Sequence, residues 1–255
     1  MNTRKVKTDE EEGILIITLN SPETLNALSR QILQELDQII DKIWYGKYFG
    51  VIIRGEGRAF SAGADINELY SLENFHQAYE YLRNGQRTLS KLEKLKYITV
   101  AAIDGYALGG GFELALACTF RVATKNSKLG LPEINLGIVP GYGGTQRLSR
   151  LISPQKAKKL IMEGKIISAE EALEIGAIDD IAQNSQELLK KAKEIIFKFK
   201  DKNPTALRYI IELCNLSNAG ELEENLRTEA LFCASCISSP YAKNKMKEFL
   251  EKKKK

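Results

Sequence analysis

Two glutamates of this sequence stand in apolar stretches, where carboxyl groups are uncommon. Glu113 lies between Phe112 and Leu114 in a segment that is apolar nearly throughout, and Glu133 lies in residues 129–137, which are rich in leucine, isoleucine and glycine. Burying a carboxylate costs on the order of several kcal/mol unless it is paired or stays protonated. Each glutamate could therefore belong to a structural ion pair or act as a general acid or base.

Two glycine-containing segments could present backbone N–H groups to a ligand. Residues 58–65 follow a predicted strand and are mostly small, so a ligand could approach the backbone, although the same pattern also fits a tight turn. Residues 105–111 end in three glycines just before the predicted helix of Glu113, where N–H groups are unpaired and the helix dipole is positive. Such donors suit an anion or an oxygen that gains negative charge during a reaction.

The two acids and the two sets of donors together indicate general acid–base chemistry on a carbonyl compound. No Walker loop or G-x-G-x-x-G fingerprint accompanies the glycines, so they do not predict a nucleotide site. The one histidine, His76, has no nucleophile motif around it, and only Cys233 and Cys236 are spaced as C-x-x-C. We therefore expect no metal site, and we expect carboxylates, backbone groups or a cofactor to carry any catalysis.

Alternating strand and helix patterns predict an α/β core that positions these residues. Buried-strand patterns cover residues 13–19, 51–54, 98–103 and 120–124, and helical patterns cover residues 29–43, 75–95, 112–118, 154–162, 168–175 and 186–200. Residues 129–144, which include Glu133, are predicted as a loop because they are rich in glycine and proline. Only helices are predicted after about residue 203. The sequence therefore predicts a core of residues 1–195 and a helical region of residues 196–255.

Composition and charge limit the kind of protein and its partners. The 255 residues are 44% hydrophobic and 27% charged, with a net charge of +4, which is typical of a folded chain with a sizeable core. No apolar stretch approaches the ~20 residues of a membrane helix, and the polar residues 1–12 do not resemble a signal peptide. We therefore expect a soluble, cytoplasmic protein with no membrane partner. The basic run at residues 190–200 is typical of a solvated helix face, so no nucleic-acid partner is expected.

Three motifs, in order, resemble those of the enoyl-CoA hydratase/isomerase, or crotonase, family. They are residues 60–66 (FSAGADI), residues 105–113 (GYALGGGFE) and residues 131–145, and residues 20–28 (NSPETLNAL) resemble the family's N-terminal signature. Order and spacing match through about residue 180. The motifs are most similar to those of enoyl-CoA hydratases and of archaeal 3-hydroxypropionyl-CoA dehydratases.

The resemblance implies a fold, an assembly and an activity. The fold would be an α/β spiral of ββα turns with a C-terminal helical region used for trimerisation, in a trimer or a dimer of trimers. The activity would be that of a hydro-lyase: syn addition of water to a trans-2-enoyl-CoA thioester, or 3-hydroxyacyl-CoA dehydration in reverse. Coenzyme A is part of the substrate there, so no separate cofactor is implied.

The resemblance also assigns roles to residues of this chain. The backbone N–H groups of Ala62 and Gly110 would form an oxyanion hole for the thioester oxygen. Glu113 would deprotonate the attacking water, and Glu133 would protonate the α-carbon. The substrate, including its coenzyme A part, would contact Arg58, Ala62, Gly63, Ala64, Asp65, Ile66, Gly110 and Tyr142.

Two other functions stay open on the sequence alone. An enoyl-CoA isomerase would have the same fold, although such relatives generally keep only one of the two acids. A crotonase homologue that binds RNA would belong to a different class, and no basic and aromatic stacking pattern supports it. The acyl pocket is expected near Leu69, Tyr70 and Tyr142, but the acyl chain length is not determined, and 3-hydroxypropionyl-CoA remains one candidate substrate.

Overall fold

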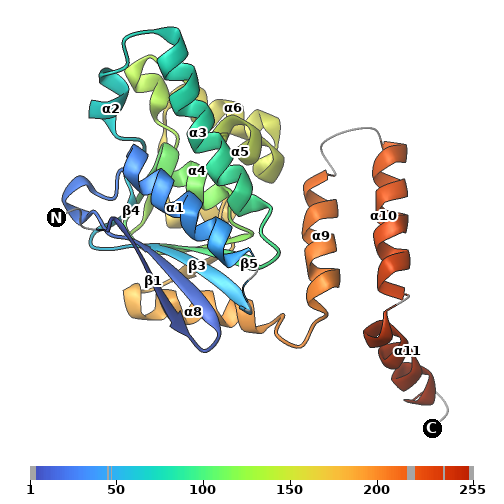
Figure 1. Ribbon diagram of the computed structural model, residues 1–255. Helices are drawn as coiled ribbons and strands as arrows, with labels where there is room; N and C mark the ends of the chain where they lie inside the picture. Colours follow the sequence, from blue (N-terminus) through green and yellow to red (C-terminus); the bar gives the residue numbers. More distant parts are fainter. Residues whose placement is uncertain (1–3, 45, 47, 217–221, 238, 253–255) are drawn as a thin grey trace. The chain divides into compact units, whose positions relative to one another are not determined.

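The computed structural model describes residues 4–44, 46, 48–216, 222–237 and 239–252 (Figure 1). The chain divides into two compact units, Met1–Lys198 and Phe199–Lys255. The first unit is an α/β structure and the second is helical.

Within the described residues, the larger sheet of the first unit has six strands in the order β1-β2-β3-β5-β7-β10. They are β1 (Val6–Glu11), β2 (Ile14–Leu19), β3 (Gly50–Gly55), β5 (Ile98–Ile103), β7 (Phe120–Thr124) and β10 (Asp180–Ala182). The strand β1 pairs antiparallel with β2, and the other neighbouring strands are parallel. Every residue of β2 and of β5 is buried, as expected for parallel strands that are covered on both faces.

A smaller sheet of four short strands, again counted over the described part of the chain, has the order β4-β6-β8-β9. They are β4 (Ala59–Ser61), β6 (Tyr106–Leu108), β8 (Lys128–Gly130) and β9 (Ile166–Ser168). The chain passes from the larger sheet to the smaller one three times in the described residues, from β3 to β4, from β5 to β6 and from β7 to β8, and a helical segment follows each pair. This repeat confirms the predicted spiral of ββα turns. The predicted loop at residues 129–144 overlaps the end of β8.

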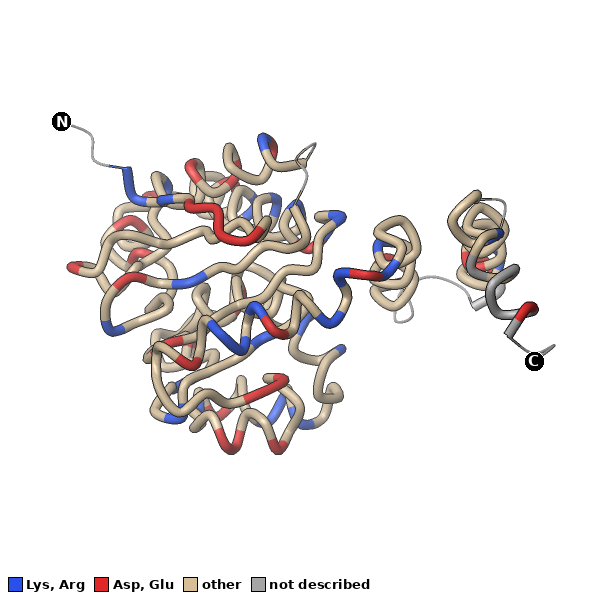
Figure 2. The backbone as a smooth tube through the Cα atoms, turned by 90° about the horizontal axis from the view of Figure 1, so that it is seen from below, with Lys and Arg blue, Asp and Glu red and all other residues tan. Residues whose placement is uncertain are grey.

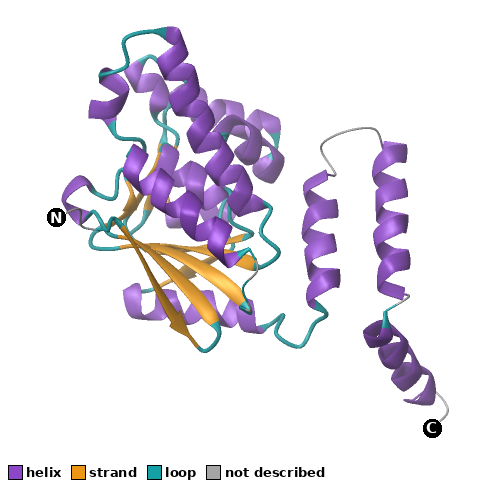
Figure 3. Cartoon of the chain, viewed as in Figure 1, coloured by secondary structure: helices purple, strands orange, loops and turns teal. Residues whose placement is uncertain are grey.

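Helices cover both faces of the larger sheet (Figures 1 and 3). The helices α1 (Arg30–Ile43) and α3 (Phe75–Glu93) pack together on one face, and α8 (Ser185–Phe197) packs on β5 and β7 from the other. The Ser29 side chain caps α1 by accepting a hydrogen bond from the Ile32 N–H at 3.3 Å. The remaining helical segments of this unit are η1 (Pro22–Thr24), α2 (Ile66–Tyr70), α4 (Gly110–Leu116), η2 (Glu133–Leu136), α5 (Gly144–Ile152), α6 (Pro154–Glu163) and α7 (Ala169–Glu174), of which η1 and η2 are 3₁₀ turns.

The basic run of residues 190–200 lies mostly on α8, where its lysines pair with acidic residues. The Lys191 Nζ lies 2.9 Å from Asp180, and the Lys193 Nζ lies 2.7 Å from Glu11. Figure 2 shows Lys and Arg interspersed with Asp and Glu along the described chain. This mixture fits the solvated helix face that the sequence predicts. Among the described helices, none is long and apolar enough to cross a membrane.

The second unit consists, in its described residues, of the helices α9 (Pro204–Leu216), α10 (Leu222–Ile237) and α11 (Pro240–Lys252). The rings of Tyr209 and Phe232 stack with their centroids 4.1 Å apart and join α9 to α10. Several large apolar side chains of the unit are exposed: Ile210, Leu226, Leu231 and Ile237. The C-terminal region is helical, as the predicted fold class requires, but the predicted boundary after residue 195 falls within α8, which ends at Phe197.

Candidate active site

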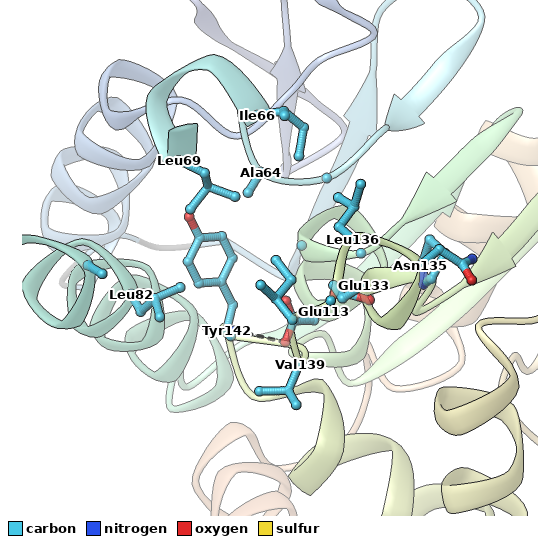
Figure 4. Close-up of a pocket in the computed structure, with 18 of the residues that line it drawn as sticks. Ala64, Ile66, Leu69, Leu82, Glu113, Glu133, Asn135, Leu136, Val139 and Tyr142 are labelled. Atoms are coloured by element: carbon cyan, nitrogen blue, oxygen red, sulfur yellow. Dashed lines mark hydrogen bonds between the residues drawn. The ribbon is translucent and has the colours of Figure 1, made fainter. Parts of the chain in front are cut away.

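A cavity of about 820 Å³ lies in the first unit, beside the turn that joins β6 to α4 (Figure 4). Its lining comes from the chain after β4, from α2 and α3, from the start of α4, and from residues 132–142. Most of the lining side chains are apolar, and the exceptions include Glu113 and Glu133. The three motifs that the sequence singles out thus meet at one cavity.

Glu113 is held in the wall of this cavity by two backbone donors. Its Oε1 atom accepts hydrogen bonds from the N–H groups of Tyr142, at 2.8 Å, and Gly144, at 2.6 Å. The side chain is only 1% exposed, because every residue of α4 is buried. This burial, aided by the nearby charge of Glu133 and opposed by the two hydrogen bonds, raises the pKa of Glu113 to about 7.

The alternative of a structural ion pair at Glu113 is wrong. Among the described residues, no cationic group lies within ion-pair distance of its carboxylate. Arg147 is the basic residue that attracts Glu113, but its guanidinium is paired with Glu93 at 2.9 Å. Glu113 is therefore a buried acid that the fold does not neutralise with a partner charge.

Glu133 begins the 3₁₀ turn η2 and points its carboxyl group into the same cavity (Figure 4). Both carboxyl oxygens are inaccessible, and neither has a hydrogen-bond partner among the described residues. Burial raises the pKa of this carboxyl group above its ordinary value. A buried carboxyl without partners costs stability, and in native structures such groups often serve a functional role.

Gly109 lets Glu133 approach the start of α4. This glycine has φ 50° and ψ −127°, and a Cβ atom added to it would lie 3.3 Å from the Glu133 Oε1. A side chain is therefore disfavoured here both by the backbone conformation and by the carboxyl group.

The backbone donor expected at Ala62 is not available, which corrects the prediction for that residue. The Ala62 N–H donates to the Leu25 carbonyl at 2.9 Å, although Ala62 does line the cavity. Leu25 and Asn26 adopt positive φ angles of 53° and 56° to reach this position. The Asn26 side chain, which is fully buried, donates to the Ala59 carbonyl at 2.8 Å and keeps the two segments together.

The N–H groups of Ala64 and Gly110 lie close together at the cavity. The Ala64 nitrogen is 3.2 Å from the position of a Cβ added to Gly110, and the Gly110 nitrogen is 3.5 Å from that of a Cβ added to Gly63. Within the part of the chain that the structure describes, neither N–H has a hydrogen-bond acceptor. The predicted donor at Gly110 is thus accessible, and Ala64 is its neighbour in place of Ala62.

The other residues predicted to contact substrate occupy different places. Gly63, Ala64, Ile66 and Tyr142 line the cavity. Asp65 caps α2, because its Oδ1 accepts a hydrogen bond from the Asn67 N–H at 2.9 Å. Arg58 is exposed in the turn between β3 and β4 and does not line the cavity.

Two expectations about further side chains can also be compared with the structure. Leu69 lines the cavity as expected, but Tyr70 does not, because it is 91% exposed to solvent. His76 is exposed and is not part of the lining. Over the described residues, no group of three or more His, Cys, Asp or Glu side chains could hold a metal ion.

Comparisons with known proteins agree with the fold and with the motifs. The family model described as "Enoyl-CoA hydratase/isomerase" matches residues 9–255. A "Probable enoyl-CoA hydratase" of Bacillus subtilis is 40% identical over 96% of this chain and 95% of its own, and a "Short-chain-enoyl-CoA hydratase" of Clostridium acetobutylicum is 37% identical over 100% and 97%. The crystal structure of an enoyl-CoA hydratase from Bacillus anthracis matches 97% of this chain and 96% of its own, with a TM-score of 0.89 and 36% identity. This chain belongs to the enoyl-CoA hydratase/isomerase family.

Proposed function

We propose that this protein is an enoyl-CoA hydratase, a hydro-lyase that adds water to a trans-2-enoyl-CoA thioester and catalyses the reverse dehydration. One observation carries the proposal: two buried carboxyl groups, Glu113 and Glu133, lie at one cavity beside the backbone N–H groups of Ala64 and Gly110. Among the residues that the structure describes, no cation pairs with either carboxyl group and neither N–H has an acceptor. The relatives from Bacillus subtilis and Clostridium acetobutylicum, which are named as enoyl-CoA hydratases, support the same reaction.

The thioester oxygen would accept hydrogen bonds from the N–H groups of Ala64 and Gly110. These donors are fixed by the backbone, so they need no reorganisation when the oxygen gains negative charge in the transition state. Losing one such donor typically lowers kcat by ~10²–10³. The coenzyme A part would run along residues 62–66, and the exposed Arg58 would meet its phosphates.

Glu113 would act as the base toward water. Its Oε1 is already engaged by Tyr142 and Gly144, so Oε2 is the oxygen left for a water molecule. The water oxygen forms a bond to C3 while one of its protons passes to Glu113. The π electrons of the C2–C3 double bond move toward the thioester, and the oxygen held by the backbone donors becomes enolate-like.

Glu133 would supply the second proton. Its carboxyl oxygens have no partner among the described residues, so a protonated Glu133 can direct its O–H at C2. A proton added to C2 from the same side as the water completes a syn addition. Burial raises the pKa of both carboxyl groups, which favours the protonated form that a proton donor needs.

Rates with crotonyl-CoA test this function. Hydration removes the conjugated double bond, so the ultraviolet absorbance of the thioester should fall in EDTA-treated enzyme. The substitutions Glu113→Gln and Glu133→Gln should each lower kcat by orders of magnitude while the affinity for a saturated acyl-CoA changes little. An isomerase would need one acid only, and one of the two substitutions would then be nearly silent.

We also propose that the protein acts as a cytoplasmic homotrimer or dimer of trimers and uses no cofactor beyond the coenzyme A of its substrate. The exposed apolar side chains of α9 and α10 support an assembly, because burying apolar surface against a second copy is favourable. The reaction adds only water to the substrate, and the two glutamates would transfer the protons, so no further cofactor is needed.

A further inference from the structure

The Tyr142 ring fills the space between the helices α4 and α3. A Cβ atom added to Gly85 of α3 would lie 2.4 Å from the Cε1 of this ring. A Cβ added to Gly110 of α4 would lie 3.0 Å from Cδ2, on the opposite edge of the ring. The side chain is 1% exposed, so the ring is wedged between two glycines with no free space at either edge.

The same residue holds the carboxylate that faces C3 of the substrate. Its N–H donates to the Glu113 Oε1 at 2.8 Å, and its side chain lines the cavity that Glu113 and Glu133 share. An acyl chain that places C3 at Glu113 would therefore have the Tyr142 side chain as a neighbour beyond C3. Leu82 of α3 continues this wall, because its Cδ2 would lie 2.5 Å from a Cβ added to Gly141. In Figure 4 the Tyr142 ring stands between the side chains of Leu82 and Glu113.

The shape of the ring, and not its hydroxyl group, accounts for this barrier. The hydroxyl groups of Tyr142 and of its neighbour Tyr81 are buried, and neither has a hydrogen-bond partner among the described residues. The two ring centroids lie 6.4 Å apart, so Tyr81 supports the Tyr142 ring from behind by packing. A phenylalanine at position 142 would therefore preserve the wall.

We infer that Tyr142 closes the acyl end of the cavity and limits the substrate to 2-enoyl thioesters with few carbons beyond C3. This inference rests on the proposed hydratase activity and adds a residue that sets the acyl chain length. Each methylene group that a pocket accepts or rejects typically changes kcat/KM by ~10–200-fold. A rigid ring at the end of the chain therefore discriminates strongly between short and medium acyl groups.

The test compares wild type with Tyr142→Ala and Tyr142→Phe on enoyl-CoA substrates of four to ten carbons. In wild type, kcat/KM should fall steeply with chain length. In Tyr142→Ala, the ratio of kcat/KM for octenoyl-CoA to that for crotonyl-CoA should rise at least ~10-fold. In Tyr142→Phe, the ratio should stay as in wild type, whatever the absolute rates. The ratio of the affinity for octanoyl-CoA to that for butyryl-CoA, measured by calorimetry, should rise in Tyr142→Ala and stay unchanged in Tyr142→Phe. These saturated thioesters are not hydrated, so this measurement does not depend on the chemical step.

Two further variants keep the test decisive. If Tyr142→Ala does not fold, Leu82→Ala should shift the ratio in the same direction by a smaller factor, because it shortens the same wall. The matched control Val139→Ala removes apolar volume from an exposed part of the lining and should leave the ratio unchanged.

Three results would overturn the inference: equal wild-type activity on eight and four carbons, a folded Tyr142→Ala or Leu82→Ala with the wild-type ratio, or a shift in Val139→Ala as large as that in Tyr142→Ala. A wild type that hydrates no substrate would refute the proposed function instead, and the affinity ratios would still decide the role of Tyr142.

Discussion

Replacing Glu113 by glutamine should stabilise the protein progressively as the pH rises from about 4.5 to 7. The pKa of the folded-state carboxyl is raised from 4.5 to about 7, chiefly because the side chain is buried. Below pH 4.5 both the folded and the unfolded chain hold the proton, so burial of this carboxyl group does not lower the free energy of unfolding of wild type through ionisation there. Between these values the unfolded chain releases the proton while the folded chain keeps it, and the free energy of unfolding falls with pH.

The magnitude follows from the shift. One pKa unit corresponds to about 1.4 kcal/mol, so a shift from 4.5 to about 7 removes roughly 3 kcal/mol of wild-type stability above pH 7. Glutamine resembles the protonated carboxyl and can still accept the N–H groups of Tyr142 and Gly144 at its Oε1. The difference in unfolding free energy, variant minus wild type, should therefore rise by about 3 kcal/mol and level off above pH 7. In a chain of this size that corresponds to roughly 6–12 °C in Tm.

Urea unfolding from pH 4.5 to 8.5, at one fixed protein concentration, measures this difference. Glu171→Gln is a control of opposite sign: the Lys165 side chain holds the pKa of Glu171 below its ordinary value, so wild-type stability from that pair is present at neutral pH and lost as the pH falls. For Glu171→Gln, the unfolding free energy of the variant minus that of wild type should become more negative as the pH rises. A difference for Glu113→Gln that is flat across the range would show that Glu113 ionises normally, and the acid–base reasoning built on its burial would fail.

The other predictions concern the partner acid, the buried amide and the assembly. Glu133→Gln should lower kcat for hydration by ~10²–10⁴, and it should also lower the pKa of Glu113, because a nearby negative charge is removed. Rates measured across pH give the first effect, and the infrared band of the Glu113 carboxyl group gives the second. An unchanged rate would exclude Glu133 as the proton donor. Asn26→Ala should lower the free energy of unfolding by about 1–3 kcal/mol for each buried group left unpaired. It should also weaken the binding of a saturated acyl-CoA, because the Asn26 side chain donates to the carbonyls of Glu56 and Ala59 and so positions the chain near Ala64. A variant with wild-type Tm and affinity would contradict this. Light scattering at micromolar concentration should give a trimer or hexamer, and a monomer would refute the proposed assembly.

The residues that carry the site could largely be predicted from the sequence, because each breaks a local pattern. Glu113 is a carboxyl in an apolar helix, and Gly110 belongs to a glycine run at a helix start. Each signal lies within a few neighbouring residues. The structure then brings Glu113, Glu133 and Gly110 to one cavity.

The donor next to Gly110 could not be predicted in the same way. Ala62 and Ala64 are both small residues of one motif, and only the long-range bond from the Ala62 N–H to the Leu25 carbonyl separates them. Residues 20–28 contained the relevant signal, since Leu25 and Asn26 form the turn that takes up this donor. The position of a carbonyl more than thirty residues away is not encoded in a local pattern.

Some elements of the fold were also missed for physical reasons. The strand β1 has the composition of a polar, charged terminus, so the sequence does not predict it as a strand. It is an edge strand in which all residues but Val6 are exposed. The strands β4, β6, β8 and β9 have three residues each, too few to show a period of two. Their pairing depends on the spiral of the whole chain and not on their own sequence.

The placement of Glu113 and Tyr142 on interlocking segments limits how this enzyme can diverge. The backbone N–H of residue 142 holds the carboxyl group of Glu113, the proposed base, while its side chain lines the cavity where we infer that the acyl chain ends. A substitution at this position can change substrate preference without moving the base, because the N–H group is the same for every residue except proline. An insertion or deletion between Val139 and Gly144 would displace the donors of Glu113 and change reactivity at once. Natural variation and directed evolution of chain-length preference should therefore proceed through residue type at position 142, with the length of this segment held constant.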